Sequence, residues 1–82
     1  MNYQIDFKPR ALKDVKVLPK AAQRWVMARI EELQNDLSGD VKKLTNFTPE
    51  YRLRVGDYRV LFEVEDGRVV IYRILHRKDA YK

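Results

Sequence analysis

The chain contains no cysteine, only three glycines and three prolines, and a single histidine. Without cysteine it forms neither a disulfide framework nor a cysteine-based metal site, which fits a reducing compartment. A lone histidine with no second histidine or cysteine is a poor basis for a metal centre, so we expect neither a metal nor a cofactor. Gly56 and Gly67 are placed as turn residues, and no glycine-rich phosphate loop is present in the sequence.

The chain also lacks a run of apolar residues long enough to span a bilayer. Residues 1–7 do not show the basic start and apolar block that mark a signal peptide. We therefore expect a cytoplasmic protein without a membrane partner. Its 82 residues suit one domain, 1–82, with a modest hydrophobic core.

Positive charge is in excess. Lysine and arginine number 17 against 12 aspartates and glutamates, which gives a formal net charge of +5. A small basic domain favours an acidic partner such as nucleic acid, through phosphate contacts and long-range steering. Many small basic domains bind nothing anionic, so the placement of these charges has to decide whether the chain has an acidic partner.

Hydrophobic periodicity predicts an α+β domain in the order β-α-α-β-β-β. Alternation over residues 1–7 indicates a half-buried strand. Two helices are predicted: the first over residues 11–18 with Pro9 in its opening turn, and the second over residues 20–37, started by Pro19. The first helix would bury Leu12, Val15 and Leu18, and the second a longer apolar stripe.

The second half of the chain reads as a connector followed by three strands. The connector covers residues 41–49, and the strands cover 51–55, 58–64 and 68–76, separated by turns at residues 56–57 and 66–67. We expect both N-terminal helices to pack on one face of a mostly antiparallel four-stranded sheet. Residues 77–82 would form a short polar tail.

Alternation along these strands sorts their side chains between two faces. Apolar residues at 51, 53 and 55 would face the helices, which leaves Arg52 and Arg54 uncovered, and Arg59 joins them from the next strand. On the last strand, one set is assigned to the helices: Val70, Tyr72, Ile74 and His76. The other set is assigned to the uncovered face: Val69, Ile71, Arg73, Leu75 and, by extrapolation, Arg77. This sorting holds only if no β-bulge intervenes.

An arginine-rich face has two interpretations. Antiparallel sheets often expose one polar side to water, and Asp57, Glu63 and Glu65 could neutralise some of the arginines. The alternative is a phosphate-binding surface, because arginine presents a planar fork of donors to phosphate oxygens. An idle face usually mixes several polar residue types, whereas this one is mainly arginine.

Three segments together resemble the RelE branch of the RelE/ParE toxin superfamily. They are Tyr-Arg-Leu-Arg-Val-Gly-Asp-Tyr-Arg-Val at 51–60, His-Arg-Lys-Asp-Ala-Tyr at 76–81, and Phe-Lys-Pro-Arg-Ala-Leu-Lys at 7–13. The resemblance covers nearly the whole chain. It implies the toxin of a type II toxin–antitoxin system, an endoribonuclease that cuts messenger RNA in the ribosomal decoding site without a metal. The 2′-hydroxyl would attack the adjacent phosphate and leave a cyclic phosphate and a free 5′-hydroxyl.

The resemblance also implies partners and site residues. The partners are the ribosome, its messenger and a cognate antitoxin, expected to be acidic and to wrap the toxin. Matching positions give Arg52, Arg54, Arg59, Arg77 and Tyr81. We assign a catalytic group, Arg54, Arg59, Arg77 and Tyr81, and an RNA-binding group, Arg52, Arg54, Arg73, His76 and Lys78. Arg59 would bind the phosphate, Arg77 would stabilise the leaving oxygen, and Tyr81 would stack on a base.

The general base stays open in this scheme. Some family members carry lysines at the two central positions, where this chain has Arg52 and Arg54. Arginine effectively cannot lose its proton, whereas a perturbed lysine can. The role therefore falls to Tyr81, to His76 as a proton-transfer group, or to no single residue.

Two other functions remain open. A ParE-like inhibitor of DNA gyrase would share the fold without needing this catalytic set. A non-catalytic RNA- or protein-binding domain, such as a toxin remnant, would use the arginines only to dock an acidic partner.

Overall fold

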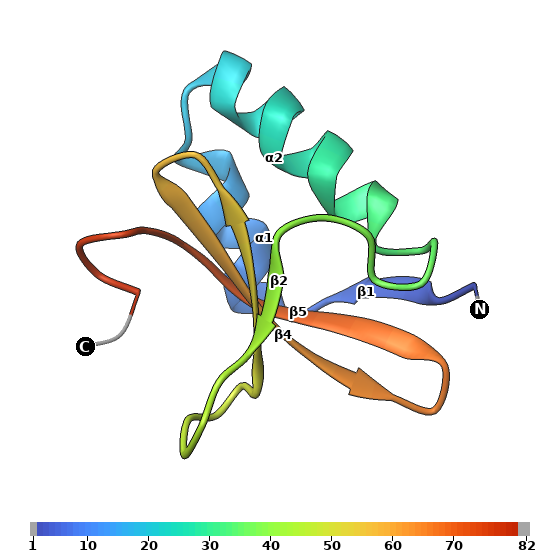
Figure 1. Ribbon diagram of the computed structural model, residues 1–82. Coiled ribbons are helices and arrows are strands. Elements are labelled where there is room, and N and C mark those ends of the chain that lie inside the picture. The colour runs from blue at the N-terminus through green and yellow to red at the C-terminus, as the bar shows by residue number, and fades with distance from the viewer. Residues whose placement is uncertain (1, 81–82) are drawn as a thin grey trace.

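The computed structural model describes residues 2–80, which fold into the expected α+β architecture (Figure 1). Its elements are β1 Gln4–Phe7, α1 Pro9–Lys16, α2 Lys20–Glu32, β2 Val41–Lys43, β3 Tyr51–Val55, β4 Tyr58–Glu65 and β5 Arg68–His76. Neither helix in this part of the chain has the length and apolar character that crossing a lipid bilayer requires.

The strands form one five-stranded sheet in the order β1-β5-β4-β3-β2. β1 runs parallel to β5, and the other neighbours are antiparallel. The sheet has one strand more than predicted, because residues 41–43 of the expected connector pair with β3, with Val41 opposite Leu53. A three-residue edge strand with one apolar side chain is too short to show an alternating pattern.

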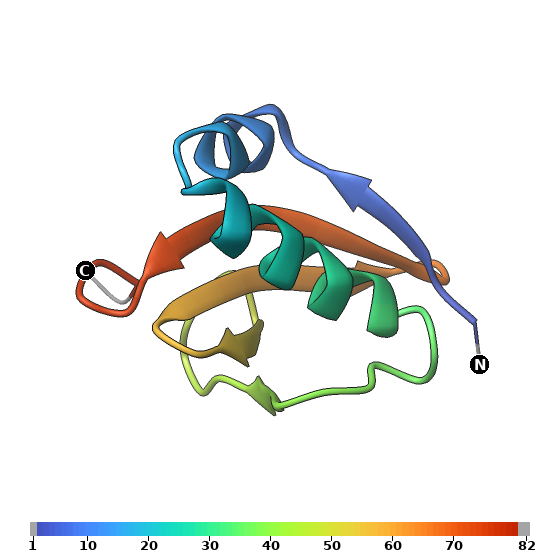
Figure 2. The same ribbon diagram turned by 90° about the horizontal axis from the view of Figure 1, so that it is seen from above.

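Helix α2 lies across one face of the sheet and encloses the core (Figure 2). Val26, Ile30 and Leu33 from its predicted stripe are buried, and they belong to one cluster with Leu53 and Phe62 of the sheet. The second helix, predicted to reach residue 37, instead ends at Glu32. The residues at 36 and 37 have positive φ angles of 54° and 58°, which a helix does not accept.

Helix α1 begins at Pro9, as predicted, but its buried face is rotated from the expected one. Val15 and Leu18 pack against the core as predicted, but Leu12 is 49% exposed, and Ala11 and Asp14 are buried instead. The helix reaches the core with a small residue because it lies close beside the sheet.

Strand β5 contains a β-bulge. Phe62 of β4 pairs with Ile71, but the preceding Leu61 pairs with Arg73, so Tyr72 is an extra residue on β5. An extra residue reverses which face each following side chain meets.

Because of this bulge, the faces predicted for the first half of β5 are wrong. Val69 and Ile71, assigned to the uncovered face, are fully buried in the core. Val70 and Tyr72, assigned to the helices, therefore alternate to the uncovered face. After the bulge, Ile74 is buried as predicted.

Candidate functional site

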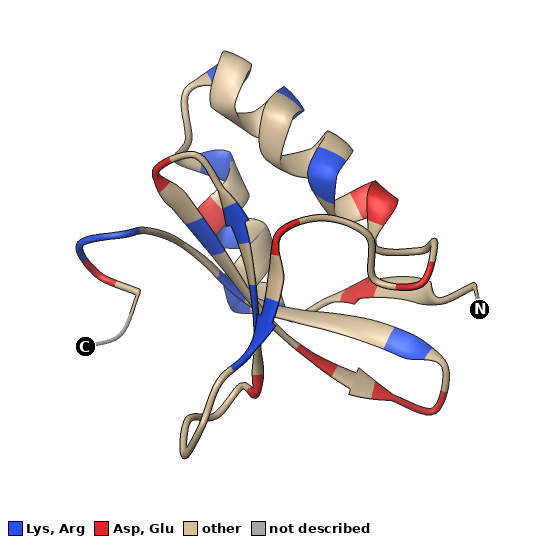
Figure 3. Ribbon diagram, viewed as in Figure 1, with Lys and Arg blue, Asp and Glu red and all other residues tan. Residues whose placement is uncertain are grey.

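Within residues 2–80 no helix covers the second face of the sheet, and this face carries two rows of basic residues. Figure 3 shows the basic positions along the ribbon of the central strands. Directly opposed residues of neighbouring strands share a face. One row joins Lys42, Arg52, Leu61 and Arg73, and the next joins Arg54, Arg59 and Leu75. We call this surface, defined by Lys42, Arg52, Arg54, Arg59 and Arg73, the arginine face.

Arg54 and Arg59 are direct partners in the β3–β4 ladder. Like charges in this position repel each other, so the pair favours an anion between them. Arg54 has a distant counter-charge, with its Nε 3.8 Å from Oδ2 of Asp40. Nη1 of Arg59 donates instead to the carbonyls of Gly56 at 2.8 Å and Tyr58 at 2.9 Å. No carboxylate among residues 2–80 forms an ion pair with Arg59.

Asp40, in the loop before β2, holds the neighbouring Arg52 more firmly. Nη1 of Arg52 donates to the Asp40 carbonyl at 3.2 Å and to Oδ1 at 3.4 Å. The side chain of Arg52 is only 13% exposed, against 59% for Arg54. Arg54 is therefore the more accessible of the two central arginines.

Arg77 lies at the end of the arginine face where Arg59 is hydrogen-bonded to the backbone. Its backbone N–H donates to the carbonyl of Asp57 at 2.7 Å, and its Nε lies 3.8 Å from Oδ1 of the same residue. Asp57 and Gly56 form the turn between β3 and β4, so both guanidinium groups are anchored on one turn. Two cations held by carbonyl groups and a loose carboxylate could together bind one phosphate.

Arg73 is held by Asp14 of α1 at the edge of the face. Its Nε donates to Asp14 Oδ2 at 2.8 Å and its Nη2 to Oδ1 at 3.3 Å. The hydrogen bond that Arg73 donates to Asp14 raises the pKa of Arg73, against a smaller opposing effect of burial. Arg73 is thus a fixed positive charge that is only partly open to a ligand.

Asp14 is the structurally important residue that the sequence prediction missed. Besides Arg73, its Oδ2 accepts the backbone N–H of Ile74 at 3.0 Å. A signal was present, because Asp14 stands between Ala11 and Val15, the two α1 residues that pack in or against the core. A charged side chain in such a position needs a buried partner.

The remaining predicted site residues are placed differently. His76 is opposite Tyr58 in the ladder, on the helix side of the sheet, with the two rings in edge contact at 6.0 Å. Its Nδ1 accepts the N–H of Lys78 at 3.3 Å, and Lys78 itself is exposed. The structure does not bring His76 onto the arginine face. Tyr81 lies outside the described residues.

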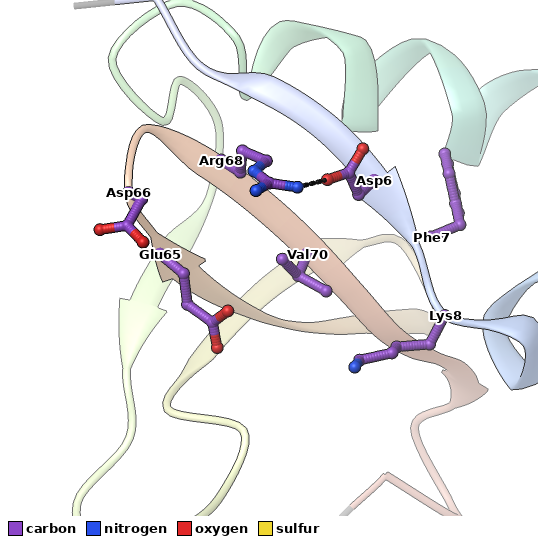
Figure 4. A pocket seen from close by; sticks show the side chains of 7 residues that line it. All are labelled: Asp6, Phe7, Lys8, Glu65, Asp66, Arg68 and Val70. Carbon is purple, nitrogen blue, oxygen red and sulfur yellow. Dashed lines mark hydrogen bonds and ion pairs between the residues drawn. The ribbon is translucent and has the colours of Figure 1, made fainter.

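The opposite end of the uncovered face has a mixed, largely acidic character. A hollow of about 280 Å³ lies there, and Figure 4 labels the residues that line it: Asp6, Phe7, Lys8, Glu65, Asp66, Arg68 and Val70. Arg68 in it pairs with Asp6 at 3.1 Å. None of the predicted site residues lines this hollow. Residues 2–80 contain no group of three or more histidine, aspartate or glutamate side chains that could hold a metal ion.

The model of one protein family, described as the ParE toxin of the type II toxin–antitoxin system parDE, matches residues 5–81. The chain is also 38% identical over 80 residues to Toxin RelE3 of Methanocaldococcus jannaschii, with 92% of this chain and 91% of the relative covered. The chain belongs to the RelE/ParE toxin superfamily. The relationship confirms the resemblance to its RelE branch, and the protein is a type II toxin of that family.

Solved structures of the family have the same fold. The RelB–RelE antitoxin–toxin complex from Methanococcus jannaschii matches with a TM-score of 0.75 and 35% identity, covering 89% of this chain and 91% of that chain. The archaeal RelE–RelB complex from Pyrococcus horikoshii OT3 matches with a TM-score of 0.78 and 30% identity, covering 98% and 100%. Both are complexes of toxin and antitoxin.

Proposed function

We propose that this family member is a ribosome-dependent endonuclease that cuts messenger RNA without a metal ion. The observation that carries the proposal is the directly opposed pair Arg54 and Arg59, of which Arg59 has no carboxylate partner in residues 2–80. A like-charged pair of this kind costs stability unless an anion is bound. A phosphate group of RNA is a suitable anion, because guanidinium groups donate paired hydrogen bonds to its oxygens.

The reaction is a transfer within the RNA. The 2′-hydroxyl oxygen attacks the adjacent phosphorus and loses its proton, while the bond from phosphorus to the 5′-oxygen of the next nucleotide breaks. The products are a 2′,3′-cyclic phosphate and a 5′-hydroxyl, which takes up a proton. Negative charge on the phosphate oxygens rises in the transition state, and fixed cations stabilise it.

Arg59 and Arg77 are assigned to this charge because they meet at the β3–β4 turn. Arg54 faces Arg59 and would share the phosphate, and Arg52 would hold the backbone beside it. Arg73 and Lys78 would contact flanking phosphates. Tyr81 keeps its proposed role in base stacking and proton transfer, and its position lies outside the described residues.

The proposed partners follow from this site and from the relatives. A RelB-type antitoxin is expected, because two of the similar structures are toxin–antitoxin complexes. An acidic antitoxin would be attracted by the net charge of +5. The ribosome and its messenger are met in the cytoplasm, where we expect the toxin to act.

The test compares Arg59→Ala with Arg68→Ala in a translation extract programmed with a defined messenger. Arg68 is the control, since it is also a strand arginine, but it is exposed and pairs with Asp6 at the far end of the sheet. We expect Arg59→Ala to lower the cleavage rate by about 100-fold or more and Arg68→Ala to leave it nearly unchanged. Naked messenger should remain almost intact with the wild type. Unaltered cleavage by Arg59→Ala would refute the proposal.

A ParE-like gyrase inhibitor is the second candidate, because the matching family model is described as a ParE toxin. It predicts DNA damage signalling on expression, with the messenger intact. Mapping messenger ends and staining DNA breaks in the same cells separates the two functions. Growth of cells that express the chain without antitoxin would instead favour a non-catalytic binding domain.

A further inference from the structure

The outer edge of β5 changes its hydrogen-bonding partner in the middle of the strand. Up to Ile71 this edge pairs with β1, and the Ile71 carbonyl accepts the N–H of Lys8 at 2.8 Å, just past the end of β1. Beyond that point α1 replaces the strand, and the carboxylate of Asp14 accepts the N–H of Ile74. A side chain thus takes over the pairing that β1 no longer supplies.

The N–H that Asp14 accepts is the one that the bulge brings to this edge. In an uninterrupted strand the backbone groups of alternate residues point to the same side, so Arg73 and Leu75 would follow Ile71 on the outer edge. The extra residue at Tyr72 shifts the alternation, and the N–H of Ile74 points outward instead. Asp14 therefore binds the strand only in its bulged form.

The bulge also decides the face on which Arg77 emerges. Val69 and Ile71 are buried against the helices. Without the extra residue, the same alternation would send Arg73, Leu75 and Arg77 toward the helices as well. With it, Arg77 reaches the turn that anchors Arg59.

We infer that Asp14 is a positioning residue: by accepting the Ile74 N–H it fixes the bulge in β5, and the bulge presents Arg77 beside Arg59. The side chain of Asp14 is only 10% exposed, so its hydrogen bond to Ile74 is shielded from water. Arg73 and Arg10 together neutralise the Asp14 carboxylate and thereby allow its burial, with Nε of Arg10 lying 3.7 Å from Asp14 Oδ1. The inference rests on the proposed function only for the importance of Arg77.

Amide hydrogen exchange tests the inference without any cleavage reaction. The reporter is the Arg77 N–H, which donates to Asp57, and the reference is the Arg54 N–H, which donates to Asp40 at 3.0 Å. In Asp14→Ala we expect the protection of Arg77 relative to Arg54 to fall about tenfold or more, the factor for losing one buried hydrogen bond. Leu33→Ala, a buried core truncation, is the control: it should lower the protection of both amides in proportion.

Two outcomes would overturn the inference. In the first, Asp14→Ala lowers the exchange protection of the Arg77 and Arg54 amides equally, as the core control does. Asp14 would then stabilise the fold without positioning Arg77. In the second, breaking the ion pair alone exposes Arg77. Arg73→Met keeps the carboxylate on Ile74, because Arg10 still lies 3.7 Å from it, and Asp14→Asn keeps an acceptor oxygen. Each should therefore retain Arg77 protection within about threefold of wild type. This second comparison decides the question even if Asp14→Ala does not fold.

Cleavage adds a separate readout. If Asp14 acts through Arg77, the losses in messenger cleavage of Asp14→Ala and Arg77→Ala should not multiply in the double variant. The double variant Asp14→Ala with Arg68→Ala should cleave like Asp14→Ala alone, because Arg68 lies at the far end of β5 and pairs with Asp6 rather than with Asp14 of α1. If the wild type cuts no messenger, the proposed function fails while the exchange result still judges the role of Asp14.

Discussion

Removing one of the two opposed arginines should give a variant that is more stable than the wild type and binds RNA less tightly. The change is Arg54→Thr, which removes one cation of the Arg54–Arg59 pair and installs a residue that favours strands. A site that holds two like charges in register sacrifices stability for anion binding, and removing one of them should reverse that balance.

The magnitude follows from the contacts of Arg54. Relief of a directly opposed like-charge pair is worth roughly 0.2–1 kcal/mol. The lost ion pair with Asp40 is long, at 3.8 Å, and the arginine is 59% exposed, so it contributes little. The net gain in the free energy of unfolding is about 0.5 kcal/mol, which for a domain of this size raises the Tm by roughly 2–4 °C.

The assay is thermal unfolding at low salt, at 1 M salt, and with added short RNA. At 1 M salt the screening length is about 3 Å, so most of the gain should disappear. With RNA the order should reverse, because a ligand that binds the folded wild type more tightly stabilises it more. A variant that is less stable than wild type at low salt, or equally stabilised by RNA, would refute the idea that this pair is an anion site.

Two further changes test the surroundings of the site. Gly56→Ala should destabilise the fold by about 2–4 kcal/mol in a denaturant melt. Gly56 has φ +57°, and a Cβ there would clash with Cη2 of Trp25. Truncating Trp25 in the same chain should recover the part of the loss that is due to the clash. Asp40→Asn should strengthen the binding of a short RNA about threefold at low salt in a filter-binding assay, because it removes the carboxylate near Arg52 and Arg54. Weaker binding would instead make Asp40 a positioning group for Arg52.

The central strands could be read from the sequence because their two faces differ chemically. In β3 and at the start of β4 arginines alternate with apolar residues, and the structure buries Leu53, Val55 and Val60 as that pattern predicts. Asp66 and Gly67 both adopt positive φ, as the hairpin signal requires. Local pattern and tertiary packing agree in this part of the chain.

The side chains of β5 could not be assigned to the two faces of the sheet in this way, because the first half of the strand is apolar on both sides. Val69 and Val70 are equally suited to burial, and alternation alone does not choose between them. The choice is made by Asp14, about sixty positions earlier, which stabilises the bulge at Tyr72. An interaction between residues so far apart leaves no periodic trace near the strand.

The charges of the arginine face have a consequence for the proposed reaction. An arginine side chain offers only hydrogen-bond donors, so Arg54, Arg59 and Arg77 can stabilise a phosphate but are unsuited to accepting the 2′-hydroxyl proton. His76, which could, packs against Tyr58 on the other side of the sheet. A site of fixed cations accelerates cleavage only when the attacking oxygen, the phosphorus and the leaving oxygen are already aligned. A messenger held in the decoding site can be presented in one conformation, whereas a free RNA strand samples many. Dependence on the ribosome is therefore the behaviour that this set of side chains favours.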